Sequence, residues 1–225
     1  MNPLPIFLKL DGCRCVVIGA GTAAEPRIVG LVDAGAVVTV VAPSVTTAVG
    51  DLIAAGTILH LPRRYQRGDL EGARLAYAAV EDDAVHAEIA SDARLGGIWL
   101  NVVDRTEWCD FITPALVQQG ALQIAVSTNG ASPALARKLR ISLQREYGPE
   151  WGTALEILRR LRTVARERGF DFTAKQAAFG RLVDGPFVDY VKQGRWRDVD
   201  ALLECFGEGV SLASLGMEGF GADDE

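Results

Sequence analysis

The chain has 225 residues, enough for one larger domain or two small ones, with an ordinary globular mix of 49% hydrophobic and 23% charged residues. Its net charge of −6 argues against a general nucleic-acid binder, because such proteins are usually basic. No apolar run approaches the length of a membrane span and no secretory pattern opens the chain, so we expect a cytoplasmic protein with free thiols at its four cysteines and no membrane contact.

The first hundred residues alternate short apolar runs with helical stretches. Strands are predicted at 14–18, 37–42, 57–61, 75–80 and 98–103, and helices at 22–34, 46–55 and 83–95. Strands that alternate with helices form a parallel sheet covered on both faces. The sequence therefore predicts an α/β fold with a Rossmann-like parallel sheet over residues 1–113.

The pattern changes after Asp104. One more strand is predicted at 121–127, followed by a loop and a helix that begins at Ser132-Pro133 and ends at Gly148-Pro149. We expect a small α+β region over 114–148, a C-terminal helical domain over 149–206 and a flexible acidic tail over 207–225, where glycine and acidic residues are frequent.

The turn after the first predicted strand reads Gly19-Ala20-Gly21-Thr22-Ala23-Ala24. This is the G-x-G-x-x-A form of a dinucleotide-binding fingerprint, in the strand-to-helix context that the fingerprint requires. Gly19 permits a tight turn, Gly21 lets the backbone approach a pyrophosphate, and Ala24 allows close packing of the helix on the strand. The helix N-terminus then supplies amide donors to the phosphates, so we predict dinucleotide binding here.

One part of the fingerprint is missing. The second strand ends in Val41-Ala42-Pro43-Ser44, which contains neither an acid for a ribose 2′-hydroxyl nor an arginine for a 2′-phosphate. Backbone groups and Ser44 would have to hold the ribose, and the fingerprint leaves NAD and NADP undecided.

Asp104 directly follows the fifth predicted strand, at the end of the sheet where ligands bind in open α/β folds. It is a candidate general base whose pKa partial burial would raise, and the alternative is a helix-capping or turn aspartate. Three acids after the fourth strand, Glu81, Asp82 and Asp83, favour a helix N-terminus instead.

No metal site is predicted. The two histidines, His60 and His86, fall in a strand and a helix without ligand spacing, and the cysteines form no CxxC pair. The segment 133–168 is basic, and either it is a solvated helix face or it binds an anionic partner. A polycarboxylate substrate would make use of Arg137, Lys138 and Arg140, just after the Ser132-capped helix start.

Three motifs in order resemble the precorrin-2 dehydrogenase/sirohydrochlorin ferrochelatase family, which includes standalone proteins and the N-terminal half of bifunctional siroheme synthases. They are Leu4-Pro5-Ile6-Phe7 with the glycine turn, Asn101-Val102-Val103-Asp104 with Cys109-Asp110-Phe111-Ile112-Thr113-Pro114-Ala115, and Ile124-Ala125-Val126-Ser127 with Gly130-Ala131-Ser132-Pro133. The resemblance runs from Leu4 to about Tyr147 and more weakly to about Phe206. It departs at Pro26, where the family usually has a basic residue, and at Thr128-Asn129, which replaces a Ser-Gly pair and leaves any regulatory role of Thr128 open.

The resemblance implies a Rossmann domain, a dimerisation region over 114–148 and a helical domain, in a homodimer that uses NAD. It implies a catalytic role for Asp104 and substrate contacts at Ser127 and Thr128. The implied cofactor contacts are Gly19, Ala20, Gly21, Thr22, Ala23, Pro43 and Ser44. The uroporphyrinogen-methylating domain of bifunctional siroheme synthases is not expected in this chain.

The function implied is NAD-dependent oxidation of the tetrapyrrole precorrin-2 to sirohydrochlorin, with ferrous iron as a second substrate if the chain also chelates. Alternatives are a dehydrogenase without chelatase activity and a non-catalytic NAD-binding redox sensor. The sequence leaves open which of these applies and which tetrapyrrole pathway uses the product.

Overall fold

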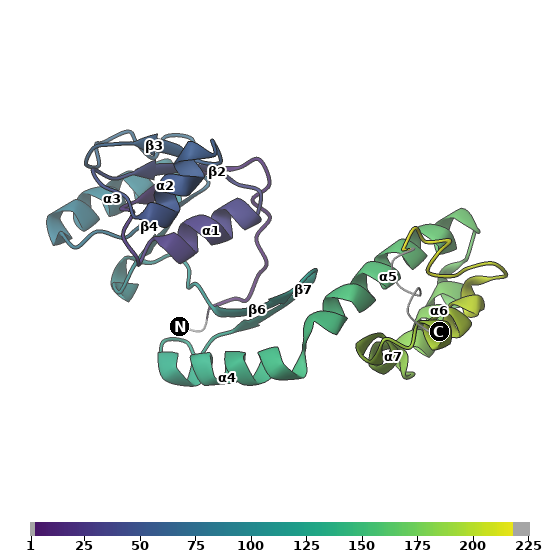
Figure 1. The fold of residues 1–225 in the computed structure, drawn as a ribbon. Helices are drawn as coiled ribbons and strands as arrows, with labels where there is room; N and C mark the ends of the chain where they lie inside the picture. The colour runs from purple at the N-terminus through teal and green to yellow at the C-terminus, as the bar shows by residue number, and fades with distance from the viewer. Residues whose placement is uncertain (1–2, 218–225) are drawn as a thin grey trace. The chain divides into compact units, whose positions relative to one another are not determined.

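The computed structural model of the chain describes residues 3–217. The chain forms two compact units, residues 1–113 and 114–225, each of which has its own core (Figure 1). Within residues 3–217, no helix combines the length and apolar character that a membrane crossing requires.

The first unit contains a five-stranded, fully parallel sheet in the order β3-β2-β1-β4-β5. Its strands are β1 (Arg14–Ile18), β2 (Val37–Val41), β3 (Leu59–Leu61), β4 (Leu75–Ala78) and β5 (Trp99–Val102). Three helices connect them: α1 (Glu25–Asp33), α2 (Thr47–Ala54) and α3 (Asp83–Gly96). All five predicted strands and all three predicted helices of this unit are present, and the Rossmann-like α/β fold is confirmed.

The central strands are apolar throughout because both faces of the sheet are buried. Successive residues of β1 alternate between two cores: Cys15 and Val17 pack with Ile28 of α1, whereas Val16 and Ile18 pack with Ile89 of α3. Burial, with the neighbouring Cys13 as the second cause, raises the pKa of the Cys15 thiol to about 11, so this cysteine is a packing residue.

The second unit begins with an antiparallel hairpin of β6 (Ala115–Gln119) and β7 (Leu122–Val126). The sequence predicted only the second of these strands, because β6 starts directly after Pro114 and its short run of alternating residues is weak evidence by itself. The turn holds Gly120 at φ 55°, and a side chain there would lie 3.1 Å from the Cα of Gly152. Because Gly152 lies in helix α5 (Pro149–Glu167), the hairpin approaches that helix backbone to backbone.

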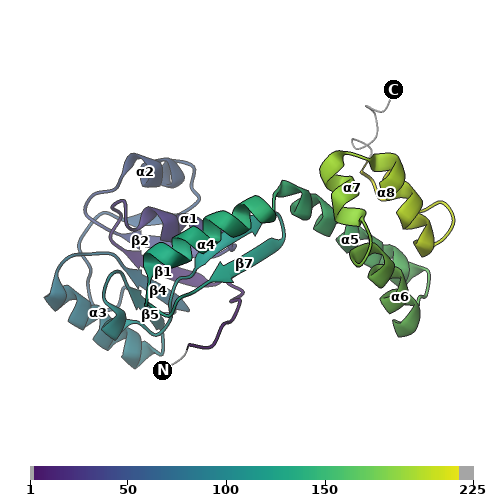
Figure 2. The ribbon, with the colours of Figure 1, turned by 90° about the horizontal axis from the view of Figure 1, so that it is seen from below.

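Helix α4 (Pro133–Glu146) lies along this hairpin (Figures 1 and 2). It begins as predicted, because the hydroxyl of Ser132 accepts a hydrogen bond of 3.2 Å from the amide of Leu135. None of its residues is buried within the chain. Leu135 and Leu139, on neighbouring turns, are 48% and 42% exposed. The two leucines thus form an exposed apolar stripe on α4.

The remaining helices form a separate core. They are α5 (Pro149–Glu167), α6 (Phe172–Val183), α7 (Phe187–Gln193) and α8 (Trp196–Leu203), followed by a short 3₁₀ turn, Glu204–Phe206. Phe206 is fully buried, and its ring lies 6.0 Å from that of Phe170 and 4.9 Å from that of Phe179. Such aromatic packing lets a small helical unit bury a large apolar area.

The prediction of a flexible tail from residue 207 is wrong for residues 207–217. Val210, Leu212, Leu215 and Met217 are buried against the helical core. Asp200 accepts a 2.6 Å hydrogen bond from the amide of Leu212, and Arg168 donates to the carbonyl of Glu208 at 3.0 Å. The glycine-rich composition concealed four apolar residues that close the core, while residues 218–225 lie outside the described part of the chain.

Replacing Leu212 with alanine tests this packing. Because Leu212 is 1% exposed, we expect Leu212→Ala to lower the free energy of unfolding of the helical unit by about 2–5 kcal/mol. Val183→Ala is the control, since Val183 is 63% exposed and its loss changes stability by about 0.5 kcal/mol or less. Guanidinium denaturation of the full chain, followed by circular dichroism, compares the two, and equal stabilities would contradict the packed tail.

Candidate functional site

The carboxyl ends of β1, β4 and β5 meet at one edge of the sheet. The strand order reverses between β1, which leads outward through β2 to β3, and β4, which leads to β5 on the other side. Ligands of open α/β sheets bind at the carboxyl edge where this reversal occurs. The residues that follow these strands therefore form the candidate site.

Gly19 makes the turn that the fingerprint requires. Its φ is 96°, and a Cβ atom there would lie 2.2 Å from the carbonyl oxygen of Ala79, which follows β4. The amide of Gly19 donates to the carbonyl of Val41 at 2.9 Å. Glycine is thus required twice over, by the backbone angle and by the close approach of the neighbouring strand.

The next residues leave room for an anion. Gly21, Thr22 and Ala23 are exposed, and the position of a Cβ on Gly21 has no atom within 4 Å. Within residues 3–217, the amides of these three residues make no hydrogen bond. Free amides at the start of a helix suit a phosphate, so the turn fits the pyrophosphate of a dinucleotide.

The helix itself starts later than predicted. The amide of Ala24 bonds to the carbonyl of Gly21 at 2.9 Å, so the chain makes a turn before α1 begins at Glu25, not at residue 22. Ala24 is fully buried, as close helix–sheet packing requires. Arg27 supports the turn, because its Nη1 donates to the carbonyl of Ala23 at 2.7 Å.

The loop after β2 lies against the glycine turn. Its first residues, Pro43 and Ser44, are exposed, and the amide of Thr46 donates to the carbonyl of Ala20 at 3.2 Å. The structure thus brings together all seven residues predicted to contact the cofactor.

Asp104 follows β5 at the same edge of the sheet. It is held in the left-handed region at φ 63°, in a turn closed by a 3.2 Å hydrogen bond from the amide of Arg105 to the carbonyl of Val102. Its side chain is exposed and has no hydrogen-bond or ion-pair partner within residues 3–217. The expected partial burial is therefore absent from this chain, because the turn projects beyond the strand. Asp104 is a turn aspartate, but it caps no helix, and its carboxylate is available to a ligand.

Two residues that the sequence analysis missed hold this turn. The Nη2 of Arg105 lies 2.6 Å from Oδ1 of Asp83 at the start of α3. The Sγ of Cys109 lies 3.2 Å from the amide of Val102 and 3.2 Å from the carbonyl of Arg105. Burial raises the pKa of Cys109, so it stays a neutral thiol that can donate to the carbonyl of Arg105 or to that of Val102, which is also 3.2 Å away. Cys109 opens one of the motifs quoted above, but neither its hydrogen bonds nor the ion pair of Arg105 can be read from the sequence.

The acids after β4 have the predicted structural role. Asp82 caps α3, accepting hydrogen bonds from the amides of Ala84 at 2.9 Å and Val85 at 3.5 Å. The Nε2 atoms of both histidines contact backbone carbonyls at 2.9 Å, His60 that of Ala42 and His86 that of Val80. Across residues 3–217, no three His, Cys, Asp or Glu side chains gather in a way that could hold a metal ion.

The predicted substrate residues belong to the second unit. The Oγ of Ser127 accepts the amide of Asn129 at 3.1 Å, and Thr128 Oγ1 donates to the carbonyl of Ser132 at 3.0 Å. These bonds shape the loop that leads into α4. On α4, Arg137 and Lys138 are exposed, while Arg140 is half-buried and donates to Gln144 at 2.8 Å.

Two family models match the chain. Residues 6–115 match the NAD(P)-binding model, and residues 119–146 match the model of the sirohaem biosynthesis protein central domain. The resemblance of the chain to siroheme-biosynthesis proteins, indicated by three short motifs, is confirmed by these matches.

The relatives that the chain matches are larger. The chain is 38% identical over 203 residues to the siroheme synthase of Methylococcus capsulatus, covering 90% of this chain and 43% of that protein. For the siroheme synthase of Azotobacter vinelandii the identity is 34% over 216 residues, covering 96% of this chain and 47% of that protein. The chain thus spans less than half the length of these relatives.

A solved structure has the same fold. The chain is similar to SirC, a precorrin-2 dehydrogenase, with a TM-score of 0.71 and 22% identity, over 88% of this chain and 100% of that chain. At this level of identity the comparison supports the fold alone. The NAD(P)-binding match supports NAD at the glycine turn, whose open amides fit it.

The two glycines of the turn offer a matched test. Gly19→Ala introduces both backbone strain and overlap with Ala79, so we expect it to cost about 2–6 kcal/mol of stability. Gly21→Ala meets no atom within 4 Å, so the protein should fold normally but bind NAD at least about tenfold more weakly. Thermal unfolding and calorimetric titration with NAD measure the two effects. A Gly21→Ala protein with unchanged NAD affinity would contradict the phosphate assignment.

Proposed function

We propose that this chain is an NAD-dependent dehydrogenase of siroheme biosynthesis that oxidises precorrin-2 to sirohydrochlorin. The observation that carries the proposal is a free carboxylate, Asp104, at the same sheet edge as a glycine turn with open amides. The oxidation removes a hydride from a carbon atom and a proton from a neighbouring nitrogen or carbon atom. It therefore requires a hydride acceptor and a base close together, at one edge of the sheet.

The comparisons support the same reaction. The relatives are named siroheme synthases, and the fold is that of a protein named precorrin-2 dehydrogenase. The family match continues from the NAD(P)-binding part through the central domain. A dinucleotide-binding domain attached to that central domain is consistent with a redox step on a tetrapyrrole.

The reaction divides between cofactor and protein. NAD, when bound, supplies the hydride acceptor. Gly21, Thr22 and Ala23 bind its pyrophosphate through their amides, and Pro43 and Ser44 border its ribose. Asp104 accepts the proton that leaves the substrate as the hydride is transferred, so that one precorrin-2 and one NAD give one sirohydrochlorin, one NADH and one proton.

The substrate carries many carboxylates, and the second unit supplies the matching charges. Arg137, Lys138 and Arg140 follow the Ser132-capped start of α4, and Ser127 and Thr128 lie in the loop before it. Arginine forks bind carboxylates with two hydrogen bonds. We assign these five residues to substrate binding. Because Thr128 already closes the loop onto Ser132, its hydroxyl contributes first to the shape of that loop.

A homodimer is the assembly we propose. Helix α4 presents Leu135 and Leu139, and β6 presents Leu116, which is 40% exposed. A second copy of the chain would bury these side chains, which is the role proposed for residues 114–148 as a dimerisation region. We place the protein in the cytoplasm, in keeping with its four free cysteines.

An anaerobic assay tests the reaction. Precorrin-2 is supplied with NAD, and absorbance follows sirohydrochlorin and NADH before ferrous iron is added. NADH formed in equal amount to sirohydrochlorin supports the dehydrogenase. A spectral change faster than the protein-free control after iron addition assigns the chelatase as well, with two pyrrole protons released for each ferrous ion inserted, and its absence leaves a dehydrogenase alone. NAD binding without turnover would instead support a redox-sensing module.

Replacing Asp104 with asparagine tests the base. Asparagine tolerates the left-handed backbone and keeps the size of the side chain, so the turn should be preserved. We expect Asp104→Asn to lower dehydrogenase turnover by about 10²–10⁴-fold with NAD affinity unchanged. Glu107→Gln, which removes a neighbouring exposed acid, is the control and should keep turnover. Normal turnover in Asp104→Asn would refute the assignment.

A further inference from the structure

Two adjacent arginines, Arg63 and Arg64, follow the carboxyl end of β3. The chain turns sharply there, with a 2.8 Å hydrogen bond from the amide of Arg63 to the carbonyl of Leu61. The carbonyl of Leu61 also accepts the amide of Ala42 at 3.2 Å, and Nε2 of His60 lies 2.9 Å from the carbonyl of Ala42. These contacts hold the arginine turn beside the loop that contains Pro43 and Ser44.

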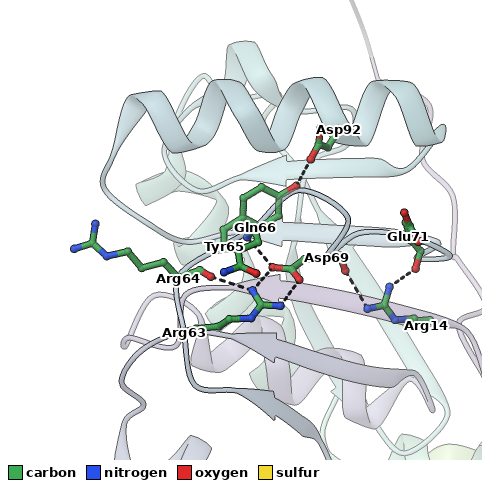
Figure 3. Close-up of polar contacts among 8 residues, drawn as sticks. All are labelled: Arg14, Arg63, Arg64, Tyr65, Gln66, Asp69, Glu71 and Asp92. Atoms are coloured by element: carbon green, nitrogen blue, oxygen red, sulfur yellow. Dashed lines mark hydrogen bonds and ion pairs between the residues drawn. The ribbon is translucent and has the colours of Figure 1, made fainter.

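Arg63 is fully engaged within the fold. Its guanidinium binds both carboxylate oxygens of Asp69, at 2.8 and 2.6 Å, and Asp69 also accepts the amide of Gln66 at 2.8 Å (Figure 3). The side chain of Asp69 is only 7% exposed, and the hydrogen bonds from Arg63 lower its pKa. A buried carboxylate compensates the charge of Arg63, and the pair fixes the path of the loop.

Arg67 and Tyr65 are engaged in a similar way. Both bind Asp92 of α3, the hydroxyl of Tyr65 at 2.7 Å and Nε of Arg67 at 3.2 Å. The loop is thus anchored at two acidic side chains, Asp69 and Asp92, and the two residues that bind Asp92 flank Gln66. Its backbone is held in place before any ligand arrives.

Arg64 is different. It is exposed, and within residues 3–217 its side chain has no hydrogen-bond or ion-pair partner. In Figure 3 the side chain of Arg64 extends away from Asp69 and its partners, on the side opposite Arg14. Arg14 is the first residue of β1 and marks the amino edge of this parallel sheet, so Arg64 extends on the carboxyl side, where the cofactor site lies.

The residues that follow β2 determine whether a positively charged side chain near the ribose can bind a 2′-phosphate. In dinucleotide-binding sheets an acid at the end of the second strand binds the ribose 2′-hydroxyl and repels a 2′-phosphate, whereas a nearby arginine accepts that phosphate. Residues 42–46 of this chain contain no charged side chain, so no acid is there to repel a phosphate. The neighbouring strand end supplies an uncompensated arginine instead.

We propose that Arg64 binds the 2′-phosphate of NADP, so that the chain accepts NADP as well as NAD. The inference rests on the proposed dinucleotide site and adds a residue that decides cofactor specificity. Arg63 and Asp69 position the loop, and Arg64 makes the contact. A guanidinium suits the role, because its planar fork matches two phosphate oxygens.

Nucleotide fragments isolate this contact from the rest of the cofactor. Calorimetric titrations of the full chain compare 5′-AMP, adenosine 2′,5′-bisphosphate and adenosine 3′,5′-bisphosphate. The last two carry the same charge and differ only in the position of one phosphate. We expect the 2′,5′ isomer to bind about tenfold more tightly than the other two, a difference of ~1.4 kcal/mol.

Two variants assign the difference to a residue. Arg64→Gln should remove the preference for the 2′,5′ isomer and leave the affinities for 5′-AMP and NAD unchanged. Arg67→Gln removes the same charge from the same loop, but from a side chain that binds Asp92, and should keep the preference. Arg64→Gln should likewise weaken NADP relative to NAD about tenfold.

The outcomes separate this inference from the function proposed above. Equal affinity of the wild-type chain for the three nucleotides, with NAD still bound, overturns the role of Arg64 and leaves the dehydrogenase intact. A preference that survives in Arg64→Gln also overturns it. Failure to bind 5′-AMP and NAD at all would refute the dinucleotide site itself, and with it both proposals.

Discussion

The close approach of Gly19 to the carbonyl of Ala79 is the constraint on which the candidate site depends. Two neighbouring parallel strands end side by side there, and a Cβ atom would lie 2.2 Å from the carbonyl oxygen. Because no side chain fits, the backbone after β1 can turn across the edge of the sheet. That turn leaves three amides free at the start of α1 and brings the loop after β2 against it. The proposed contacts of NAD with the glycine turn and with the loop after β2 depend on this geometry.

At the same edge of the sheet, the backbone of Asp104 is strained. Asp104 adopts a left-handed conformation that costs free energy for a residue with a side chain, and strain of this kind persists where surrounding contacts enforce it. The thiol of Cys109 and the ion pair of Arg105 with Asp83 provide those contacts. These contacts hold the backbone of the turn, while the carboxylate of Asp104 stays exposed and available to a ligand.

The second unit depends on a different principle. Its helical core closes on Phe206 and on the segment 207–217, while the hairpin and α4 leave leucines exposed. The helical core is therefore complete within the chain, whereas the apolar side chains of α4 stay exposed. Arg137 and Lys138 add an exposed positive charge to the same helix. Helix α4 thus carries both exposed positive charge and exposed apolar area.

The sequence by itself determined the local features of this protein. Continuous apolar runs fixed the parallel strands, the glycine pattern fixed the first turn, and Ser132-Pro133 fixed the start of α4, because each depends on neighbouring residues alone. Only the tertiary structure decided the rest. Arg105 pairs with Asp83, 22 residues away, and the segment 207–217 packs on helices that precede it. The contacts of Cys109 and the pairing of β6 with β7 involve nearby residues, but only the folded backbone brings their atoms together. The exposure of Asp104 and of Arg64 likewise depends on how the chain packs around them. Composition and spacing carry no record of such contacts, since they arise when the chain closes on itself.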